Sequence, residues 1–426
     1  MDLYELRCIF IFIFLVVISQ IQRSNAKNYT GHAIVKIPTD DINKLFPEFV
    51  DSKSINNFHD EELEELWKTN EKHGNFTVLR LGPRHKHRMK RSPQYSLITD
   101  NLQRWIRESF ASSMQSSKEV FQSSLVPDIR LDQYQPLDRI YYFLNQLINI
   151  APVRVFDIGV THEGRKIKAI EYRGNEHDSR IVWIDSTIHA REWITPSTAL
   201  YVLEQLIISK AKVNLIMIPV LNPDGYDYTW TTDRLWRKNR RQTSKRRSAH
   251  DECNGVDLNR NFDANFHGDG SSEDQCSQLY QGPGPFSEPE SRAMANLVWS
   301  LRKNIKLAIS FHSFSQIWTC PYAHQDSPSR DIRMHMEILK AIGDAVAKVN
   351  GVHYTIGPLS SVLYVGSGFS MDWIYDKAGI MHSYLVELRD KGFYGFLLPA
   401  DQIIPTAMET WAGIRAAIRK VLDINI

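Results

Sequence analysis

A histidine and a glutamate stand three residues apart directly after an apolar run, and together they could bind a metal ion. His189 and Glu192 form an H-x-x-E pattern, and residues 181–184 before them are typical of a buried strand. Zn²⁺ accepts imidazole and carboxylate ligands, and a catalytic zinc site needs only three of them from the protein. The spacing alone is weak, because a chain with 15 histidines contains it by chance. A third ligand must therefore come from elsewhere in the chain.

His312 is the candidate for this third ligand, because it follows another apolar run, residues 305–311, that predicts a strand. Two ligands from one turn and a third from a distant strand are a common arrangement in catalytic zinc sites, and they leave a fourth position for water. A histidine at the end of a strand could also be a satisfied structural residue. Other residues with the matching chemistry must separate the two interpretations.

From about residue 134 onward, strand-like and helix-like patterns alternate. Apolar runs typical of strands occur at residues 166–172, 181–188, 214–221, 305–311 and 383–388. Helical patterns lie between and after them, at residues 197–209, 288–302, 332–348 and 406–422. This alternation predicts an α/β fold in which helices cover a mostly parallel central sheet. Ligands of such folds gather at the carboxyl ends of strands, where His189 and His312 are both expected.

The first 130 residues differ in pattern from the rest. Residues 1–26 combine Arg7, an apolar run and small residues, which predicts a secretory signal peptide. Further on, the patterns predict two strands and two helices, at residues 31–37, 76–81, 61–67 and 98–109. A stretch rich in Ser and Gln, followed by residues 126–130, predicts an exposed, cleavable linker.

The composition is that of a globular protein, with 42 % hydrophobic and 23 % charged residues. A formal net charge of +2 supplies no basic excess to neutralise phosphates, so we expect no nucleic-acid partner. No segment after the signal approaches membrane length, so the mature protein is expected to be secreted and extracellular, without a membrane contact. In this oxidising compartment Cys253 and Cys276 are expected to form a disulfide, and Cys320 a buried thiol.

Further motifs occur in a fixed order along the chain. They are His189-Ala-Arg-Glu192-Trp, Asn222-Pro-Asp-Gly, Arg234-Leu-Trp-Arg237-Lys, Gly255-Val-Asp-Leu-Asn259-Arg260-Asn-Phe, Phe311-His312-Ser313, Tyr364, Glu387-Leu-Arg-Asp390 and Gly395-Phe-Leu-Leu-Pro399. In order and spacing this set resembles the secreted zinc metallocarboxypeptidases of the pancreatic A/B type, over residues 134–424. Residues 27–130 more loosely resemble the inhibitory pro-segment of those enzymes.

The resemblance implies a domain organisation and a cofactor. Residues 1–26 would be the signal peptide, residues 27–130 an activation pro-segment with a small α+β, ferredoxin-like fold, and residues 131–426 the catalytic domain. The catalytic domain would have a mixed, mostly parallel sheet with helices on both faces. It would bind one Zn²⁺ per chain.

The resemblance also implies a role for each matching residue. His189, Glu192 and His312 would bind Zn²⁺, and Asp257 would orient His189. Glu387 would be the general base that takes a proton from the attacking water and later passes it to the leaving amine. Arg237 would stabilise the oxyanion of the tetrahedral intermediate.

An exopeptidase must also recognise a free α-carboxylate. The resemblance assigns this task to the fork of Arg260, helped by Asn259 and the Tyr364 hydroxyl. It places Arg191 in a neighbouring subsite, and Ser313 is also expected to bind substrate. The glycines after Tyr364 suit a loop that closes on the substrate.

The pocket for the last side chain of the substrate indicates the specificity. Family members that remove Lys or Arg carry an acidic residue at its base, where this chain has Met371, with Leu359 and Leu385 as apolar walls. An ammonium group would be unpaired there, which is costly, so C-terminal aliphatic or aromatic residues are expected. Two departures from the family pattern are Phe369, which replaces a glycine and would narrow the pocket, and Phe314, which replaces a tyrosine.

We therefore expect a secreted, monomeric carboxypeptidase zymogen of A-type specificity that acts on peptide and protein C-termini. Its own pro-segment would inhibit it until a trypsin-like protease cleaves the chain near Arg130. One alternative is B-type specificity for Lys and Arg, which Met371 disfavours. The other is an inactive peptide-binding relative, which is disfavoured because the candidate ligands and the candidate base Glu387 are all present.

Overall fold

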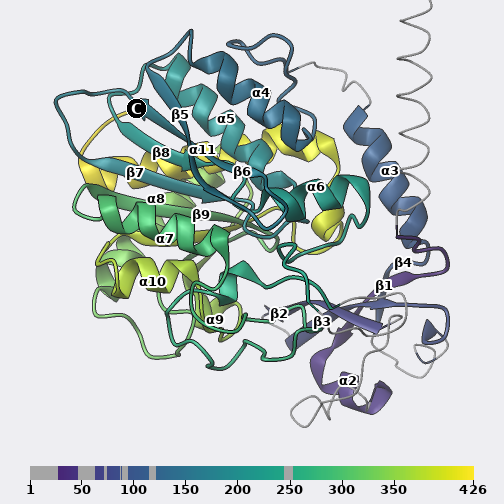
Figure 1. Cartoon of the computed structure of the whole chain (residues 1–426). Helices are drawn as coiled ribbons and strands as arrows, with labels where there is room; N and C mark the ends of the chain where they lie inside the picture. The colour runs from purple at the N-terminus through teal and green to yellow at the C-terminus, as the bar shows by residue number, and fades with distance from the viewer. Residues whose placement is uncertain are drawn as a thin grey trace, which may run out of the picture.

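The computed structural model of the chain describes residues 27–46, 63–71, 74–86, 88, 95–114, 121–243 and 253–426. They form an N-terminal unit of residues 27–114 and a larger C-terminal unit of residues 121–426, each with its own sheet (Figure 1). The predicted signal peptide, residues 1–26, lies outside the described residues.

The C-terminal unit is built on an eight-stranded sheet with the strand order β11-β10-β12-β9-β7-β8-β6-β5. The four central strands β12, β9, β7 and β8 are mutually parallel, whereas β6 and β5 on one side are antiparallel, as is the β10–β12 pair on the other. The strands are β5 Val153–Val160, β6 Lys166–Arg173, β7 Ile181–Ser186, β8 Asn214–Ile218, β9 Ile305–Ser313, β10 Ile317–Cys320, β11 Thr355–Pro358 and β12 Ser383–Leu388. The predicted α/β class and the mixed sheet are both confirmed.

Helices cover both faces of this sheet (Figure 1), because successive side chains of a strand point to opposite sides. In β7, Val182 and Ile184 join the core shared with helices α4, α5, α8 and α11, whereas Trp183 joins the core shared with α7 and α10. The helices are α4 Leu137–Leu147, α5 Ile194–Ile208, α6 Pro223–Thr231, α7 Pro289–Leu301, α8 Ile332–Asn350, α9 Leu359–Val362, α10 Ser370–Asp376 and α11 Ile403–Leu422.

The N-terminal unit is a small α+β unit, as predicted. Its four strands follow the order β2-β3-β1-β4, and all neighbours are antiparallel. The elements are β1 Ala33–Pro38, α2 Thr39–Leu45, β2 Leu63–Glu71, β3 Gly74–Leu81, β4 Ser96–Thr99 and α3 Leu102–Met114. The ferredoxin-like classification of this unit stays a prediction.

Three local predictions for residues 61–130 are wrong. Residues 63–67 are not helical but belong to strand β2, because pairing with β3 outweighs the local helix preference of this charged segment. Residues 98–99 end strand β4, so helix α3 begins only at Leu102. The predicted exposed linker is wrong at Val126 and Ile129, which are 4 % and 0 % exposed in the core of the C-terminal unit, whereas Pro127 and Asp128 between them are exposed.

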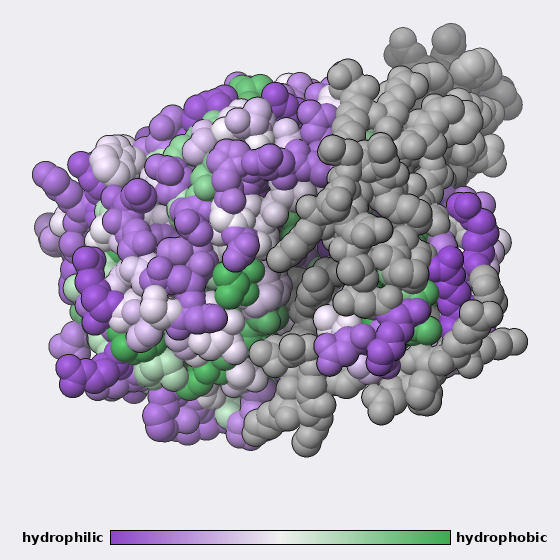
Figure 2. Space-filling view, turned by 90° about the horizontal axis from the view of Figure 1, so that it is seen from below, coloured by the Kyte–Doolittle hydropathy of each residue, from purple (hydrophilic) through white to green (hydrophobic). Residues whose placement is uncertain are grey.

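The described surface mixes apolar and polar residues in the view from below. Figure 2 shows hydrophobic residues in small groups between hydrophilic ones on that face. Within the described ranges, none of the helices combines the length and the apolarity that a membrane crossing requires.

Candidate metal centre and active site

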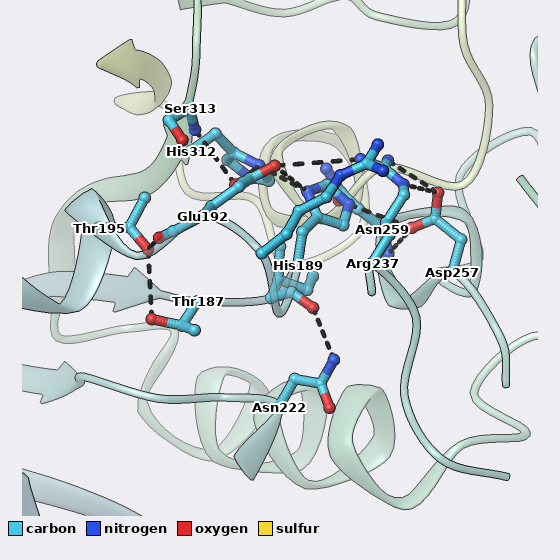
Figure 3. A network of polar contacts seen from close by, with 12 residues as sticks. Thr187, His189, Glu192, Thr195, Asn222, Arg237, Asp257, Asn259, His312 and Ser313 are labelled. Atoms are coloured by element: carbon cyan, nitrogen blue, oxygen red, sulfur yellow. Dashed lines mark hydrogen bonds and ion pairs between the residues drawn. The ribbon is translucent and has the colours of Figure 1, made fainter. Parts of the chain in front are cut away.

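A tight turn after strand β7 presents the H-x-x-E pattern. Thr187 adopts a left-handed conformation, with φ of 58°, which is unusual for a β-branched residue. Its hydroxyl donates to the Pro219 carbonyl at 2.9 Å, and the Asn222 amide donates to the Ile188 carbonyl at 3.2 Å. These bonds hold the turn after β7 in a strained shape, and this turn positions His189, the next residue (Figure 3).

The three candidate ligands converge at one point, as Figure 3 shows. The Nδ1 atom of His189 lies 2.8 Å from Glu192 Oε1, and 3.3 Å from Nδ1 of His312. His312 Nδ1 is also 3.5 Å from Glu192 Oε2. All three side chains are buried, and their ligand atoms lie within 4.8 Å of one another. Two imidazole nitrogens and a carboxylate that face each other are a donor set that fits Zn²⁺.

The charges of this group suit a cation. Burial alone would raise the pKa of Glu192. The neighbouring His189 and His312 outweigh this effect and lower the pKa, so the carboxylate is ionised. Burial lowers the pKa of His312, which favours the neutral imidazole that a metal ligand must be. The group therefore includes a neutral imidazole, that of His312, and a negative carboxylate, that of Glu192.

Asp257 links the metal group to two arginines. Its Oδ1 lies 3.1 Å from His189 Nε2, and its Oδ2 accepts from Arg237 Nε and Nη2 at 3.0 and 2.8 Å. Arg260 Nη1 is 3.9 Å from the same oxygen. Although burial would raise it, Arg237, Arg260 and His189 hold the pKa of Asp257 well below its usual value. A permanent carboxylate therefore faces the far nitrogen of His189 and can fix its orientation.

Glu387 is a buried carboxylate on strand β12 that uses little of its hydrogen-bonding capacity. It is 4 % exposed, and its Oε2 has no hydrogen-bond partner among the described residues. Burial and the neighbouring Glu192 raise the pKa of Glu387 well above its usual value, and Arg237 and Arg260 act in the opposite direction. A buried acceptor without a donor is costly in a purely structural role, so it indicates a site for a reactant.

Arg260 and Asn259 lie side by side on a short helical turn, η3 Leu258–Arg260. Arg260 Nη1 donates to the Asn259 carbonyl at 2.9 Å, and Nη2 donates to the Tyr364 hydroxyl at 3.3 Å. The Asn259 side-chain oxygen accepts from the Ser370 backbone N–H at 2.9 Å, while its buried Nδ2 has no hydrogen-bond partner among the described residues. These donors form a group that fits a carboxylate.

The predicted side-chain pocket is apolar at the predicted positions. Met371, Leu359 and Leu385 are 0–1 % exposed and belong to one apolar cluster. The Thr319 hydroxyl lies 3.9 Å from the Met371 sulfur. Asp372, the nearest acidic residue in sequence, accepts from the Ala323 and His324 backbone N–H groups and from the His324 ring, so its charge is already engaged.

The remaining predicted residues lie around this centre. Arg191 stacks on the Phe396 ring at 4.2 Å, and the Ser313 backbone N–H donates to Glu192 Oε2 at 3.1 Å. Phe369 packs against the Arg260 guanidinium at 4.5 Å, and Phe314 meets Phe396 edge-on at 4.9 Å. Phe369 therefore lies beside Arg260, one of the donors that fit a carboxylate, and also belongs to the apolar cluster.

The predicted disulfide between Cys253 and Cys276 is formed, with a Cα–Cα distance of 4.4 Å. Cys320 is a buried free thiol, as expected. Burial raises the pKa of Cys320 to about 12, so it is unreactive at neutral pH.

The sequence-based reasoning missed Ser310, which contacts His312, and Asp185, which contacts Ser310. Ser310 Oγ lies 3.2 Å from His312 Nε2, and it donates to Asp185 Oδ1 at 2.6 Å. A signal was present, because Asp185 is a charged residue inside the apolar run of residues 181–188. Its partner could not be found without the strand order.

Comparison with known proteins identifies the family of the chain. Residues 140–413 match the zinc carboxypeptidase family. The chain is 38 % identical to carboxypeptidase B of Astacus astacus, over 68 % of this chain and 97 % of that protein. It is also 38 % identical to carboxypeptidase A2 of Rattus norvegicus, over 70 % of this chain and 72 % of that one.

A solved structure covers the N-terminal unit as well. The crystal structure of thrombin activatable fibrinolysis inhibitor is 30 % identical, covers 93 % of this chain and all of that chain, and superimposes with a TM-score of 0.78. The chain therefore belongs to the zinc carboxypeptidase family and is a metallopeptidase hydrolase.

Proposed function

We propose that this chain is the secreted zymogen of a carboxypeptidase that removes aliphatic and aromatic C-terminal residues. The observation that supports it most is that one site combines three features. They are a His-Glu-His donor set, the buried Glu387 carboxylate, whose Oε2 has no hydrogen-bond partner among the described residues, and a group of donors suited to an α-carboxylate. A hydrolase needs the first two, and the third makes it an exopeptidase.

His189, Glu192 and His312 would hold one Zn²⁺ per chain, in line with the family. When bound, Zn²⁺ supplies a water of lowered pKa and polarises the scissile carbonyl. Asp257 would orient His189 by accepting from its Nε2, and the Ser313 backbone N–H would hold Glu192.

Glu387 would act as the general base and then as the general acid. Its raised pKa suits a group that must take a proton from the attacking water and keep it until the amine leaves. Arg237 would stabilise the negative charge that develops on the carbonyl oxygen. Its two bonds to Asp257 fix the guanidinium. Its Nη1 lies 3.9 Å from Oε1 of Glu192, one of the three candidate metal ligands.

Arg260, Asn259 and Tyr364 would bind the terminal carboxylate of the substrate. Asn259 Nδ2 supports this role, because it has no partner in the described part of the chain and a buried donor of this kind is otherwise unfavourable. Binding here limits cleavage to the last peptide bond.

The proposed A-type specificity rests on Met371 and its neighbours. A Lys or Arg side chain would place its charge against the apolar side chains of Met371, Leu359 and Leu385, which is costly. The relatives do not decide the question, because they include both A and B types at equal identity.

The proposed latency rests on contacts between the two units. Ile34, Val78 and Leu102 of the N-terminal unit share an apolar cluster with Phe314 and Phe396, beside Arg191. In addition, the buried Tyr29 hydroxyl donates to Asp233 Oδ1 at 2.7 Å. This packing supports a pro-segment that covers the approach to the site until it is cut off.

Activation would follow trypsin-like cleavage between helices α3 and α4, where Lys118 and Arg130 are the basic residues. Arg130 is held by Asp132 at 2.6 Å, which disfavours cleavage there in the folded precursor. The test is to assay purified precursor on peptides ending in Phe, Leu or Lys before and after limited trypsin treatment. Release of Phe and Leu only after cleavage supports the proposal, and full activity of the intact precursor contradicts it.

A further inference from the structure

His312 is backed by a chain of two hydrogen bonds that ends in a buried carboxylate. His312 Nε2 lies 3.2 Å from Ser310 Oγ, which in turn donates to Asp185 Oδ1 at 2.6 Å. The other oxygen of Asp185 accepts from Trp183 Nε1 at 2.8 Å. All four side chains are at most 3 % exposed, so water does not compete for these bonds.

The sheet register produces this chain. Asp185 of β7 and Ser310 of β9 are direct neighbours on parallel strands. Ser310 and His312 are two residues apart on β9, as Trp183 and Asp185 are on β7, so each pair points to the same face. The hydrogen bonds between His312, Ser310 and Asp185 are therefore fixed by the backbone of two central strands rather than by a loop.

The hydrogen positions follow from the chemistry of the groups. A serine hydroxyl has one hydrogen, and an ionised carboxylate can only accept. Burial raises the pKa of Asp185 to about 6, which still leaves it ionised near neutral pH. Ser310 therefore gives its hydrogen to Asp185 and offers a lone pair to His312, so His312 Nε2 must carry the N–H. The lone pair of Nδ1 is then free on the side that faces His189 and Glu192.

We propose that Asp185 and Ser310 are positioning residues that fix the tautomer and the ring orientation of His312 as a metal ligand, an inference that rests on the proposed zinc site. His189 has a carboxylate, Asp257, in direct contact with its far nitrogen. The far nitrogen of His312 reaches a carboxylate only indirectly, because the Ser310 hydroxyl lies between this nitrogen and Asp185. Both imidazoles would thus be made stronger ligands by a buried carboxylate.

A purely structural role for Asp185 predicts a different pattern. If Asp185 only satisfied buried donors of the two strands, its bond to Trp183 within β7 and its bond to Ser310 of β9 would both act through stability alone. Only the Ser310 bond leads on to His312. The two bonds can therefore be separated by mutation.

The experiment measures the rate at which the full chain, loaded with zinc, releases the metal to a chromophoric chelator in excess. Ser310→Ala is expected to release zinc about 10–100-fold faster than the wild type, and Ser310→Thr, which restores a hydroxyl, more slowly than Ser310→Ala. Trp183→Phe is the matched control, because it removes the other bond to Asp185 while leaving the Ser310–His312 contact. It should lower the unfolding temperature without changing zinc release.

Asp185→Asn is a second variant in case Ser310→Ala does not fold, and it is expected to accelerate release as well. Zinc release from Ser310→Ala or Asp185→Asn at the wild-type rate overturns the inference. So does equal acceleration by Trp183→Phe. A wild-type chain that binds no zinc contradicts the proposed function itself, whereas the inference alone fails when wild type and Ser310→Ala hold zinc equally well.

Discussion

Glu387 stands directly opposite His312 on two adjacent parallel strands, β12 and β9. This register brings a candidate proton carrier and a candidate metal ligand, 75 residues apart in the sequence, together at the carboxyl ends of two neighbouring strands. Since both residues are within regular strands, their spacing does not depend on a loop. The reacting groups are therefore preorganised by the sheet itself.

Replacing Glu387 by glutamine should abolish turnover while leaving zinc bound. The amide keeps the size of the side chain but cannot take a proton, so kcat is expected to fall by about 10²–10⁴-fold or more. Peptide assays and zinc content by atomic spectroscopy check the two parts. Glu273→Gln is the control, since that side chain is 79 % exposed. Near-normal kcat in Glu387→Gln would remove Glu387 from the mechanism.

Replacing Met371 by aspartate should move the preference toward C-terminal Lys and Arg. A carboxylate at the pocket base would pair with the incoming cation, so the ratio of kcat/KM for Lys over Phe peptides is expected to rise about 100-fold, or roughly 3 kcal/mol. Met371→Leu is the control and should keep the preference for Phe. An unchanged ratio in Met371→Asp would mean that Met371 does not line the pocket.

Replacing Arg260 by lysine should reduce cleavage of peptides with a free C-terminus. Lysine keeps the charge but loses the two-pronged donor, and a buried charge pair of this kind contributes about 2–4 kcal/mol to binding. The kcat/KM for free-acid peptides should fall 30-fold or more, as that energy implies, while the slow cleavage of C-terminal amides stays the same. Arg173→Lys, at an exposed side chain, is the control. Equal losses on acids and amides would contradict a carboxylate-binding role.

Glu290 should make the stability of the fold dependent on pH. It is buried beside Glu288 and His162, and burial raises the pKa of Glu290 to about 7. A raised pKa means that the folded state binds the proton more tightly than the unfolded state, where glutamate titrates near 4.3. The associated stability is complete below about pH 4 and is lost as the pH rises through 7.

Glu290→Gln cannot ionise, so its free energy of unfolding should fall less between pH 5 and 8 than that of the wild type, by up to about 3 kcal/mol. Urea unfolding at several pH values measures this difference. Glu176→Gln, at an exposed position, should follow the wild-type curve. Parallel curves for Glu290→Gln and the wild type would show that Glu290 does not titrate in this range.

The sequence predicted the C-terminal unit better than the N-terminal one, for a physical reason. Strands such as β12 are continuous apolar runs because they are buried on both faces, and this pattern needs no knowledge of the partners. Residues 63–71 carry charges on an edge strand, so only their pairing with β3 reveals a strand. Likewise Val126 and Ile129 read as a linker until the core that receives them is known.

In the site, the motifs predicted which residues come together and that Asp257 supports His189, but not what supports His312. The convergence of His189, Glu192 and His312 follows from their spacing and from strand ends in a parallel sheet. The contact of Asp185 with Ser310 depends on which strands are neighbours, and that is a property of the tertiary fold.

The central claim is that a zinc site with a carboxylate-binding group removes one apolar C-terminal residue at a time. Mass spectrometry of a set of peptides identical except for a last residue of Phe, Leu or Lys tests this claim directly, with trypsin-treated protein whose trypsin has been inhibited. We expect loss of single Phe or Leu residues, arrest by a chelator, and recovery on addition of one equivalent of Zn²⁺. Internal cleavage, faster removal of Lys, or activity that persists after removal of the metal would contradict it.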